Sequence, residues 1–159
     1  MTDAGHTAEL LSPEEGEVQL FNHLDKAETR TADATVADID PAEVDLLVLP
    51  GGVANPDLLR QSDEAVQFVK AVHDAGKPVA AICHAPWTLV EADVVKGRTL
   101  TSWPSVHTDI VNAGGTWVDE EVVVDRNGSN VLITSRKPDD LAAFDATIIV
   151  EVARAAAHA

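Results

Sequence analysis

The stretch from Pro78 to Pro86 constrains the fold of this chain most, because a short apolar run stops abruptly at the only cysteine in the sequence. His84 follows Cys83, and Pro86 suits the first turn of a helix. The pattern predicts a buried strand, a tight turn that carries Cys83, and a helix. A thiol at such a turn lies near a helix N-terminus, which lowers its pKa. We therefore predict a nucleophilic cysteine; the alternative is a small buried residue that only fills space in the core.

The rest of the chain alternates apolar runs with helical patterns and contains no internal repeat. Residues 17–40 are mixed and polar and predict short extended pieces at best. Continuous apolar strands separated by helices indicate an α/β sandwich with a mostly parallel sheet. The predicted strands cover residues 8–11, 46–49, 79–82, 99–101, 122–124 and 131–134, and the predicted helices cover residues 63–75, 86–95, 105–112 and 138–157.

Ligands of such sheets bind beyond the carboxyl ends of the strands. Two sequence features fall at that edge, namely Gly51-Gly52 after one strand and Cys83-His84 after the next. Glycine lets a backbone N–H group approach a substrate closely, and N–H groups at a helix start can hold a developing oxyanion. The Gly-Gly pair is by itself more typical of a simple turn, and it gains weight from the cysteine on the neighbouring strand.

Composition excludes several classes of partner. The chain has 27 acidic and 11 basic residues in 159, a formal net charge of −16, which repels nucleic acid and anionic membranes. A single cysteine allows no internal disulfide, no apolar run is long enough to span a membrane, and the first residues do not resemble a signal peptide. We expect one cytoplasmic domain over residues 1–159, with no nucleic-acid and no membrane partner. Scattered acids with few lysines suggest a high-salt cytoplasm, and an ordinary acidic mesophilic protein is the alternative.

Histidine and tryptophan residues add secondary candidates. A lone cysteine with dispersed histidines is no zinc signature, so we expect no metal and no cofactor. His23 and His107 are the histidines that could approach the site, and Trp103 follows a strand end and could line a pocket. The other histidines apart from His84 are expected at the surface; they are His6, His73 and His158.

Several segments together resemble the DJ-1/PfpI family, and most closely its branch of PfpI-like intracellular proteases and general stress proteins. The resemblance implies a three-layer sandwich of the flavodoxin-like or class I glutamine amidotransferase-like type. The matching segments occur in family order and are Leu47-Val48-Leu49-Pro50-Gly51-Gly52, Gly76-Lys77-Pro78-Val79-Ala80-Ala81-Ile82-Cys83-His84, Gly97-Arg98-Thr99-Leu100-Thr101-Ser102-Trp103-Pro104, Asn112-Ala113-Gly114-Gly115, and Thr134-Ser135-Arg136-Lys137-Pro138-Asp139-Asp140-Leu141.

The resemblance implies roles for individual residues. Cys83 matches the family nucleophile, and His84 matches the histidine that assists it. The oxyanion site is implied at Gly51, Gly52 and the backbone N–H of His84. Asp57 stands where hexameric members place an acid that reaches the Cys-His pair of a neighbouring subunit, so a homo-oligomer, from dimer to hexamer, is expected. Those members usually carry Glu, which is longer than Asp57.

The beginning of the chain departs from the family pattern. Family members start with a buried strand and a helix whose first turn carries a Glu that hydrogen-bonds the cysteine. Both elements and that Glu have no counterpart here, so we expect an N-terminally short domain that is less stable and less active than a longer form. Glu9, Glu14 and Glu15 are expected to be solvated carboxylates that do not replace it.

Three classes of function remain. The first is a cysteine enzyme acting on small reactive carbonyls, of the glyoxalase III or protein deglycase type, which we favour because a shallow site suits small aldehydes. The second is a PfpI-type peptidase that uses the same nucleophile on peptides. The third is a non-enzymatic stress protein, either a chaperone or a sensor whose Cys83 is oxidised. Glutamine amidotransferases need a His-x-Glu pair late in the chain, and Thr134-Ser135-Arg136-Lys137 offers none.

Overall fold

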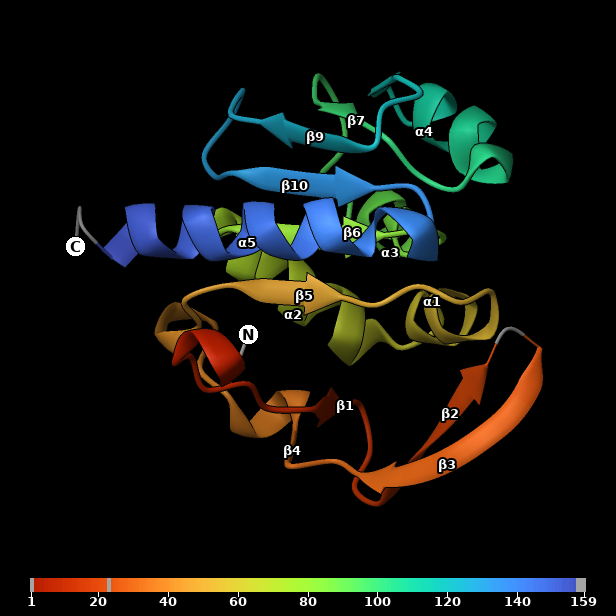
Figure 1. Cartoon of the computed structure of the whole chain (residues 1–159), viewed down its shortest axis with the longest axis vertical. Coiled ribbons are helices and arrows are strands. Elements are labelled where there is room, and N and C mark those ends of the chain that lie inside the picture. The colour runs from red at the N-terminus through yellow and green to blue at the C-terminus, as the bar shows by residue number, and fades with distance from the viewer. Residues whose placement is uncertain (1, 23, 157–159) are drawn as a thin grey trace.

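The centre of the molecule is a four-stranded sheet. The computed structural model describes residues 2–22 and 24–156. The strands have the order β5-β6-β10-β9, with β5, β6 and β10 parallel and β9 antiparallel to β10 (Figure 1). Their bounds are β5 Leu47–Leu49, β6 Val79–Ile82, β9 Val122–Asp125 and β10 Leu132–Ser135. The mostly parallel sheet predicted from the apolar runs is therefore confirmed.

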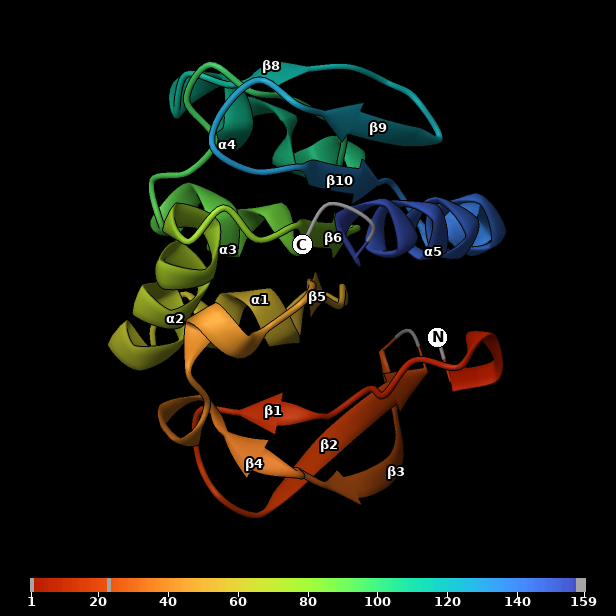
Figure 2. The same cartoon turned by 90° about the vertical axis from the view of Figure 1, so that its left-hand side faces the viewer.

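Helices cover both faces of this sheet, which makes three layers. Helices α2 (Asp63–Asp74) and α3 (Pro86–Glu91) lie on one face, and α5 (Leu141–Ala156) lies alone on the other (Figures 1 and 2). The short helices α1 (Ala54–Leu59) and α4 (His107–Asn112) flank the same side as α2 and α3 (Figure 2). The α/β sandwich is thus the observed fold class.

The strand β6 shows how the two hydrophobic layers form. Successive side chains of a strand point to opposite faces, so Val79 and Ala81 pack with α2 and α3 while Ala80 and Ile82 pack with α5. All four residues are buried, which explains why the run is apolar throughout rather than alternating.

Local signals in the sequence explain the main helix boundaries. The Ser62 hydroxyl accepts a hydrogen bond from the backbone N–H of Ala65 at 3.2 Å and caps α2. Gly76, at φ 76°, lets the chain turn back after α2. Pro86 occupies the first turn of α3, where its missing N–H costs no hydrogen bond.

The N-terminal third folds differently from the expectation. Instead of short extended pieces it forms an antiparallel hairpin of β2 (Glu17–Asn22) and β3 (Asp25–Thr31), and the prediction for this segment was wrong. Every residue of β3 is exposed, so no alternation of apolar side chains reveals the strand. The short parallel pairs were also not predicted as pairs; they are β1 (Leu11–Ser12) with β4 (Ala34–Thr35) and β7 (Thr99–Leu100) with β8 (Thr116–Trp117).

One edge of the central sheet is open. In the part of the chain that the structure describes, β5 is hydrogen-bonded to β6 alone. The β1–β4 pair lies on the open side of β5 without joining it (Figure 1). Val48, in the middle of β5, is 40% exposed, which is unusual for a strand of a parallel sheet.

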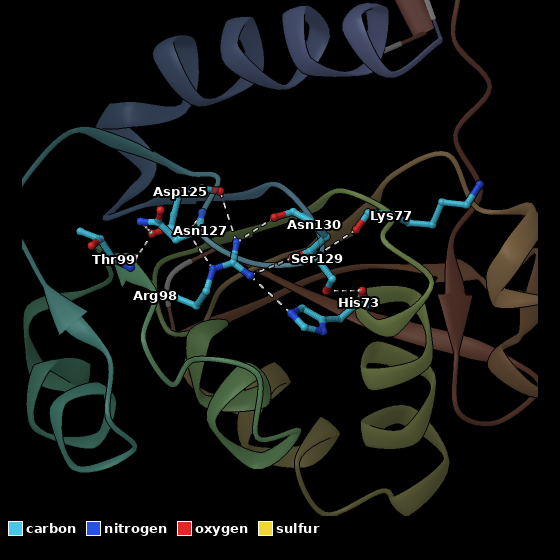
Figure 3. A network of polar contacts seen from close by, with 8 residues as sticks. All are labelled: His73, Lys77, Arg98, Thr99, Asp125, Asn127, Ser129 and Asn130. Atoms are coloured by element: carbon cyan, nitrogen blue, oxygen red, sulfur yellow. Dashed lines mark hydrogen bonds and ion pairs between the residues drawn. The ribbon is translucent and has the colours of Figure 1, made fainter. Parts of the chain in front are cut away.

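A buried ion pair connects the amino ends of β6, β7 and β10 with the carboxyl end of the antiparallel strand β9 (Figure 3). Arg98 is 4% exposed and donates from Nε to Asp125 Oδ1 at 2.6 Å and from a terminal nitrogen to Asn130 Oδ1 at 2.8 Å. Asp125 accepts the backbone N–H of Thr99 at 2.7 Å, and Asn130 donates to the carbonyl of Lys77 at 2.9 Å. The network thereby joins the start of β7, the β9–β10 connection and the entry into β6.

His73 takes part in this network, although the sequence predicted a surface residue. Its Nε2 lies 3.4 Å from a guanidinium nitrogen of Arg98, and its Nδ1 lies 3.1 Å from Asp74 Oδ1 (Figure 3 shows the Arg98 contact). The side chain is only 16% exposed because the end of α2 packs over the β9–β10 connection.

Candidate active site

Cys83 lies at a sharp turn between β6 and α3. Its φ of 65° is in the left-handed region, which is strained for a residue with a side chain. Two backbone hydrogen bonds hold this conformation: the N–H of Cys83 donates to the carbonyl of Ser135 at 3.0 Å, and the N–H of Trp103 donates to the carbonyl of Cys83 at 2.8 Å. The turn that the sequence predicted is therefore present, and neighbouring segments hold it in place.

Polar groups converge on the sulfur atom. Sγ lies 3.2 Å from Nδ1 of His84, and the backbone N–H groups of Gly52 and His84 donate hydrogen bonds to it. Gly51 packs directly against the turn, since a Cβ built there would lie 2.6 Å from Cβ of Cys83 and 2.9 Å from the carbonyl oxygen of Ile82. The loop after β5 can thus bring the N–H of Gly52 to the sulfur because Gly51, which packs against the turn, has no side chain.

The acidity of Cys83 differs from the expectation. Burial raises the pKa of the Cys83 thiol, and the N–H groups of Gly52 and His84 offset this effect only in part. We predicted a lowered pKa from the position next to α3, and the structure contradicts that prediction. The physical reason is that the half-buried sulfur loses hydration while no charged partner replaces it.

His84 is enclosed by aromatic rings. The residue is 7% exposed, its ring stacks on Trp103 with centroids 5.7 Å apart, and Trp87 contacts it at 5.1 Å. Nε2 lies 3.4 Å from Oγ of Ser105. Burial lowers the pKa of His84, so the ring is neutral at neutral pH and can accept a proton. Trp103 lies at the site, as its position after a strand end suggested, whereas Ser105 was not identified from the sequence.

The acidic candidates lie away from the sulfur. Asp57 is exposed on α1, and among the described residues its carboxylate makes no hydrogen bond to Cys83 or His84. The early carboxylates of Glu9, Glu14 and Glu15 are exposed too, and no carboxylate of the described chain is hydrogen-bonded to Sγ.

The remaining candidates do not add to the site. His107 packs against Trp117, with ring centroids 4.6 Å apart. His23 and His158 lie outside the described residues. Within residues 2–22 and 24–156, no group of three or more His, Cys, Asp or Glu side chains could hold a metal ion. No helix in these ranges is long and apolar enough to cross a membrane.

A three-layer α/β sandwich with a cysteine at a strand–turn–helix elbow, beside a histidine and two backbone N–H groups, defines a class of proteins built for thiol chemistry. Within that class, the chain belongs to the DJ-1/PfpI family, whose family model matches residues 1–151.

Curated relatives carry stress-protein, protease and deglycase names. General stress protein 18 of Bacillus subtilis (strain 168) is 41% identical over 90% of this chain and 80% of its own length. From the same organism, the protein named "Putative cysteine protease YraA" is 39% identical over the same shares. Protein/nucleic acid deglycase 2 of Escherichia coli (strain K12) is 47% identical over 72% of this chain, and the match spans 64% of the deglycase.

Solved structures agree with the fold. A two-domain protein from Anabaena variabilis with DJ-1/ThiJ/PfpI-like and ferritin-like domains has a TM-score of 0.86 and 34% identity, covering 96% of this chain and 43% of that chain. The DJ-1beta protein of Drosophila melanogaster has a TM-score of 0.68 and 30% identity over 82% of this chain and 72% of its own.

Proposed function

We propose that this protein is a stress-related cysteine enzyme that acts on small reactive carbonyls, of the glyoxalase or deglycase type. The observation that carries the proposal is the contact of 3.2 Å between Sγ of Cys83 and Nδ1 of His84, at an elbow where two backbone N–H groups face the sulfur. A neutral imidazole beside a thiol can take its proton as the sulfur attacks an aldehyde. The deglycase names among the relatives favour this substrate class.

The chemistry needs no external oxidant or reductant. The thiol proton passes to Nδ1 of His84, the sulfur electron pair forms a bond to the aldehyde carbon of methylglyoxal, and the carbonyl π electrons move to oxygen. His84 returns the proton to that oxygen, which gives a hemithioacetal. Proton transfer between the two carbons produces a lactoyl thioester on Cys83, and water then releases lactate. The net reaction adds one water to methylglyoxal.

The raised thiol pKa predicts slow turnover. Only a small fraction of Cys83 is a thiolate at neutral pH, and in the described chain no carboxylate is hydrogen-bonded to the sulfur to assist the transfer. We therefore expect methylglyoxal consumption to rise with pH toward alkaline values.

The test is methylglyoxal consumption and lactate formation in thiol-free buffer. The native chain should form lactate, and Cys83→Ser and His84→Asn should abolish it, while Ser129→Ala, an exposed serine on the β9–β10 connection, should leave the rate unchanged. Lactate formation that survives in Cys83→Ser, or that is absent from the native chain at every pH, would sink the proposal.

Peptide hydrolysis is the second candidate, because one relative carries a protease name. The same sulfur would attack a peptide carbonyl, and the N–H groups of Gly52 and His84 would hold the oxyanion. A fluorogenic peptide assayed in parallel separates the two: cleavage that depends on Cys83 without lactate formation would favour the peptidase. Oxidation of Cys83 by dilute peroxide without turnover of either substrate would favour a redox-sensing or chaperone stress protein.

We further propose a homo-oligomer in which Asp57 of one copy faces the Cys83–His84 pair of another. Asp57 is exposed on α1, directly after the glycine loop of the site, and is free to meet a second copy. Sedimentation should give more than one chain per particle at micromolar concentration, and Asp57→Asn should slow turnover without changing the particle mass. A monomer with native turnover would contradict the shared site.

A further inference from the structure

His84 has a different neighbour at each ring nitrogen. Nδ1 lies 3.2 Å from Sγ of Cys83, and Nε2 lies 3.4 Å from Oγ of Ser105. A neutral imidazole carries one proton, so one nitrogen donates and the other accepts. The neighbour of Nε2 therefore influences what Nδ1 can do to the thiol.

The two tautomers have opposite consequences for Cys83. With the proton on Nδ1, the ring can only donate toward the sulfur and cannot take the thiol proton. With the proton on Nε2, the lone pair of Nδ1 faces the sulfur and can accept it. A hydroxyl beside Nε2 can accept the Nε2–H or donate to a bare Nε2, and only the first arrangement goes with the second tautomer.

The segment Trp103–Val106 is built to hold that hydroxyl in place. The N–H of Trp103 is bonded to the carbonyl of Cys83 at 2.8 Å, and its ring stacks on His84. Pro104 opens a 3₁₀ turn in which the N–H of Val106 donates to the carbonyl of Trp103 at 3.0 Å. Val106 is fully buried, so the turn is anchored in the core while Ser105 faces Nε2.

Because the His84 ring is buried, the Ser105 hydroxyl rather than water is the polar neighbour of Nε2. His84 is 7% exposed, with Trp103 stacked on its ring and Trp87 packed against it at a tilt, so water has little access to the ring. Ser105 is itself exposed, which lets its hydroxyl proton point to solvent while its oxygen accepts from Nε2.

We propose that Ser105 is a positioning residue, whose hydroxyl holds His84 in the tautomer that leaves Nδ1 free to take the Cys83 proton. The effect of Ser105 on the turnover rate rests on the proposed function, but the His84 tautomer and the reactivity of the Cys83 thiol can be measured without any substrate. Ser105 itself does not touch the reacting carbon.

The experiment compares Ser105→Ala, Ser105→Thr and the matched control Ser129→Ala. Nitrogen-15 NMR of the His84 ring, assigned with His84→Asn, reports the tautomer, and the rate of iodoacetamide alkylation reports proton removal from Cys83. The native chain should show the proton on Nε2. Ser105→Ala should lower the Nε2–H population and slow alkylation about three- to tenfold, the range expected for one net hydrogen bond. Ser105→Thr should restore both readouts, and Ser129→Ala should change neither.

Two results would overturn the role of Ser105: an unchanged tautomer in Ser105→Ala, or slower alkylation that Ser105→Thr does not restore. Circular dichroism of each variant shows whether a loss comes from unfolding instead. If the tautomer and the alkylation rate follow the expectation while no variant forms lactate, Ser105 keeps its positioning role and the carbonyl substrate is wrong.

Discussion

At the scale of single residues, the site is a neutral pair. Burial raises the pKa of the Cys83 thiol, and burial lowers the pKa of His84. Both shifts disfavour the thiolate–imidazolium ion pair, because desolvation penalises the charged form of each group. The two N–H groups on Sγ work in the opposite direction and mark where the negative charge develops.

The first prediction concerns the pH dependence of Cys83. A folded-state pKa above the unfolded value means that alkylation by iodoacetamide is slower than that of a free thiol near pH 7 and rises as the pH increases through about 8.5 and beyond. The same shift affects the free energy of unfolding. The contribution of the protonated thiol to stability is fully present at pH values below the unfolded pKa and is lost as the pH rises through the folded pKa.

The measurement is the second-order alkylation rate of the folded chain between pH 6 and about 11, with the chain unfolded in guanidinium as its control. Unfolding should move the midpoint to the ordinary thiol value. A folded midpoint below that of the unfolded chain would show that the turn and the start of α3 outweigh burial, as the sequence alone suggested.

At the scale of elements, the Arg98 network determines how the loops at the amino ends of the strands fit together. Burial would by itself raise the pKa of the Asp125 carboxyl, but the N–H groups of Thr99 and Asn127 and the guanidinium of Arg98 hold it below its usual range. Because the carboxyl pKa is lower in the folded than in the unfolded chain, the Asp125 carboxylate stabilises the fold at pH values above the unfolded pKa. This contribution is lost as the pH falls through the folded pKa. The acid limit of stability should therefore lie below about pH 4.

The second prediction is that breaking this pair destabilises the whole domain. Arg98→Met leaves the Asp125 carboxylate buried without its cation, which typically costs about 3–5 kcal/mol. Urea denaturation at neutral pH should show a loss of that size, with the slope unchanged.

The matched control is Lys70→Met, which removes an exposed ion pair of 3.0 Å with Asp74 on α2. An exposed pair of this spacing contributes about 0.3–0.5 kcal/mol, so the urea midpoint should barely move. Equal losses for the two variants would mean that the buried network has no special stabilising role.

At the scale of the whole molecule, charge is the dominant property. A formal net charge of −16 on 159 residues creates self-repulsion that salt screens. The hairpin of β2 and β3 adds to it, because Asp25 and Glu28 lie on a strand whose residues are all exposed.

The third prediction is that salt stabilises this protein. Raising KCl from about 0.1 M to about 2 M should raise the melting temperature by about 2–8 °C, which corresponds to a gain of about 1–2 kcal/mol. A variant that neutralises four exposed acids should show a smaller rise; the substitutions are Asp25→Asn, Glu28→Gln, Glu43→Gln and Asp45→Asn. A stability optimum below physiological salt would exclude adaptation to a high-salt cytoplasm.

The open edge of β5 is also a property of the whole molecule. Val48 is 40% exposed on a strand that has one hydrogen-bonded neighbour in the described residues. Unpaired strand edges promote pairing between chains, so this edge is where the fold is least protected.

The sequence by itself determined the parts of this protein that depend on local patterns. Apolar runs predicted β5, β6, β9 and β10, the Ser62 cap and Gly76 bounded α2, and the residues around Cys83 predicted the elbow. These signals act within a few residues, so no knowledge of distant contacts was needed. The hairpin of β2 and β3 had no such signal because every residue of β3 is exposed and no residue of β2 is fully buried.

Only the tertiary structure decided the electrostatics of the site and the partners of buried groups. The pKa of Cys83 depends on its burial and on the N–H of Gly52 in the loop after β5, which is 31 residues away in the chain. Likewise, Arg98 meets Asp125 and Asn130 only because β7 and the β9–β10 connection come together. Desolvation and charge pairing depend on distance in space rather than on order in the chain, so a pattern of residue types predicted the turn at Cys83 but not the acidity of its thiol.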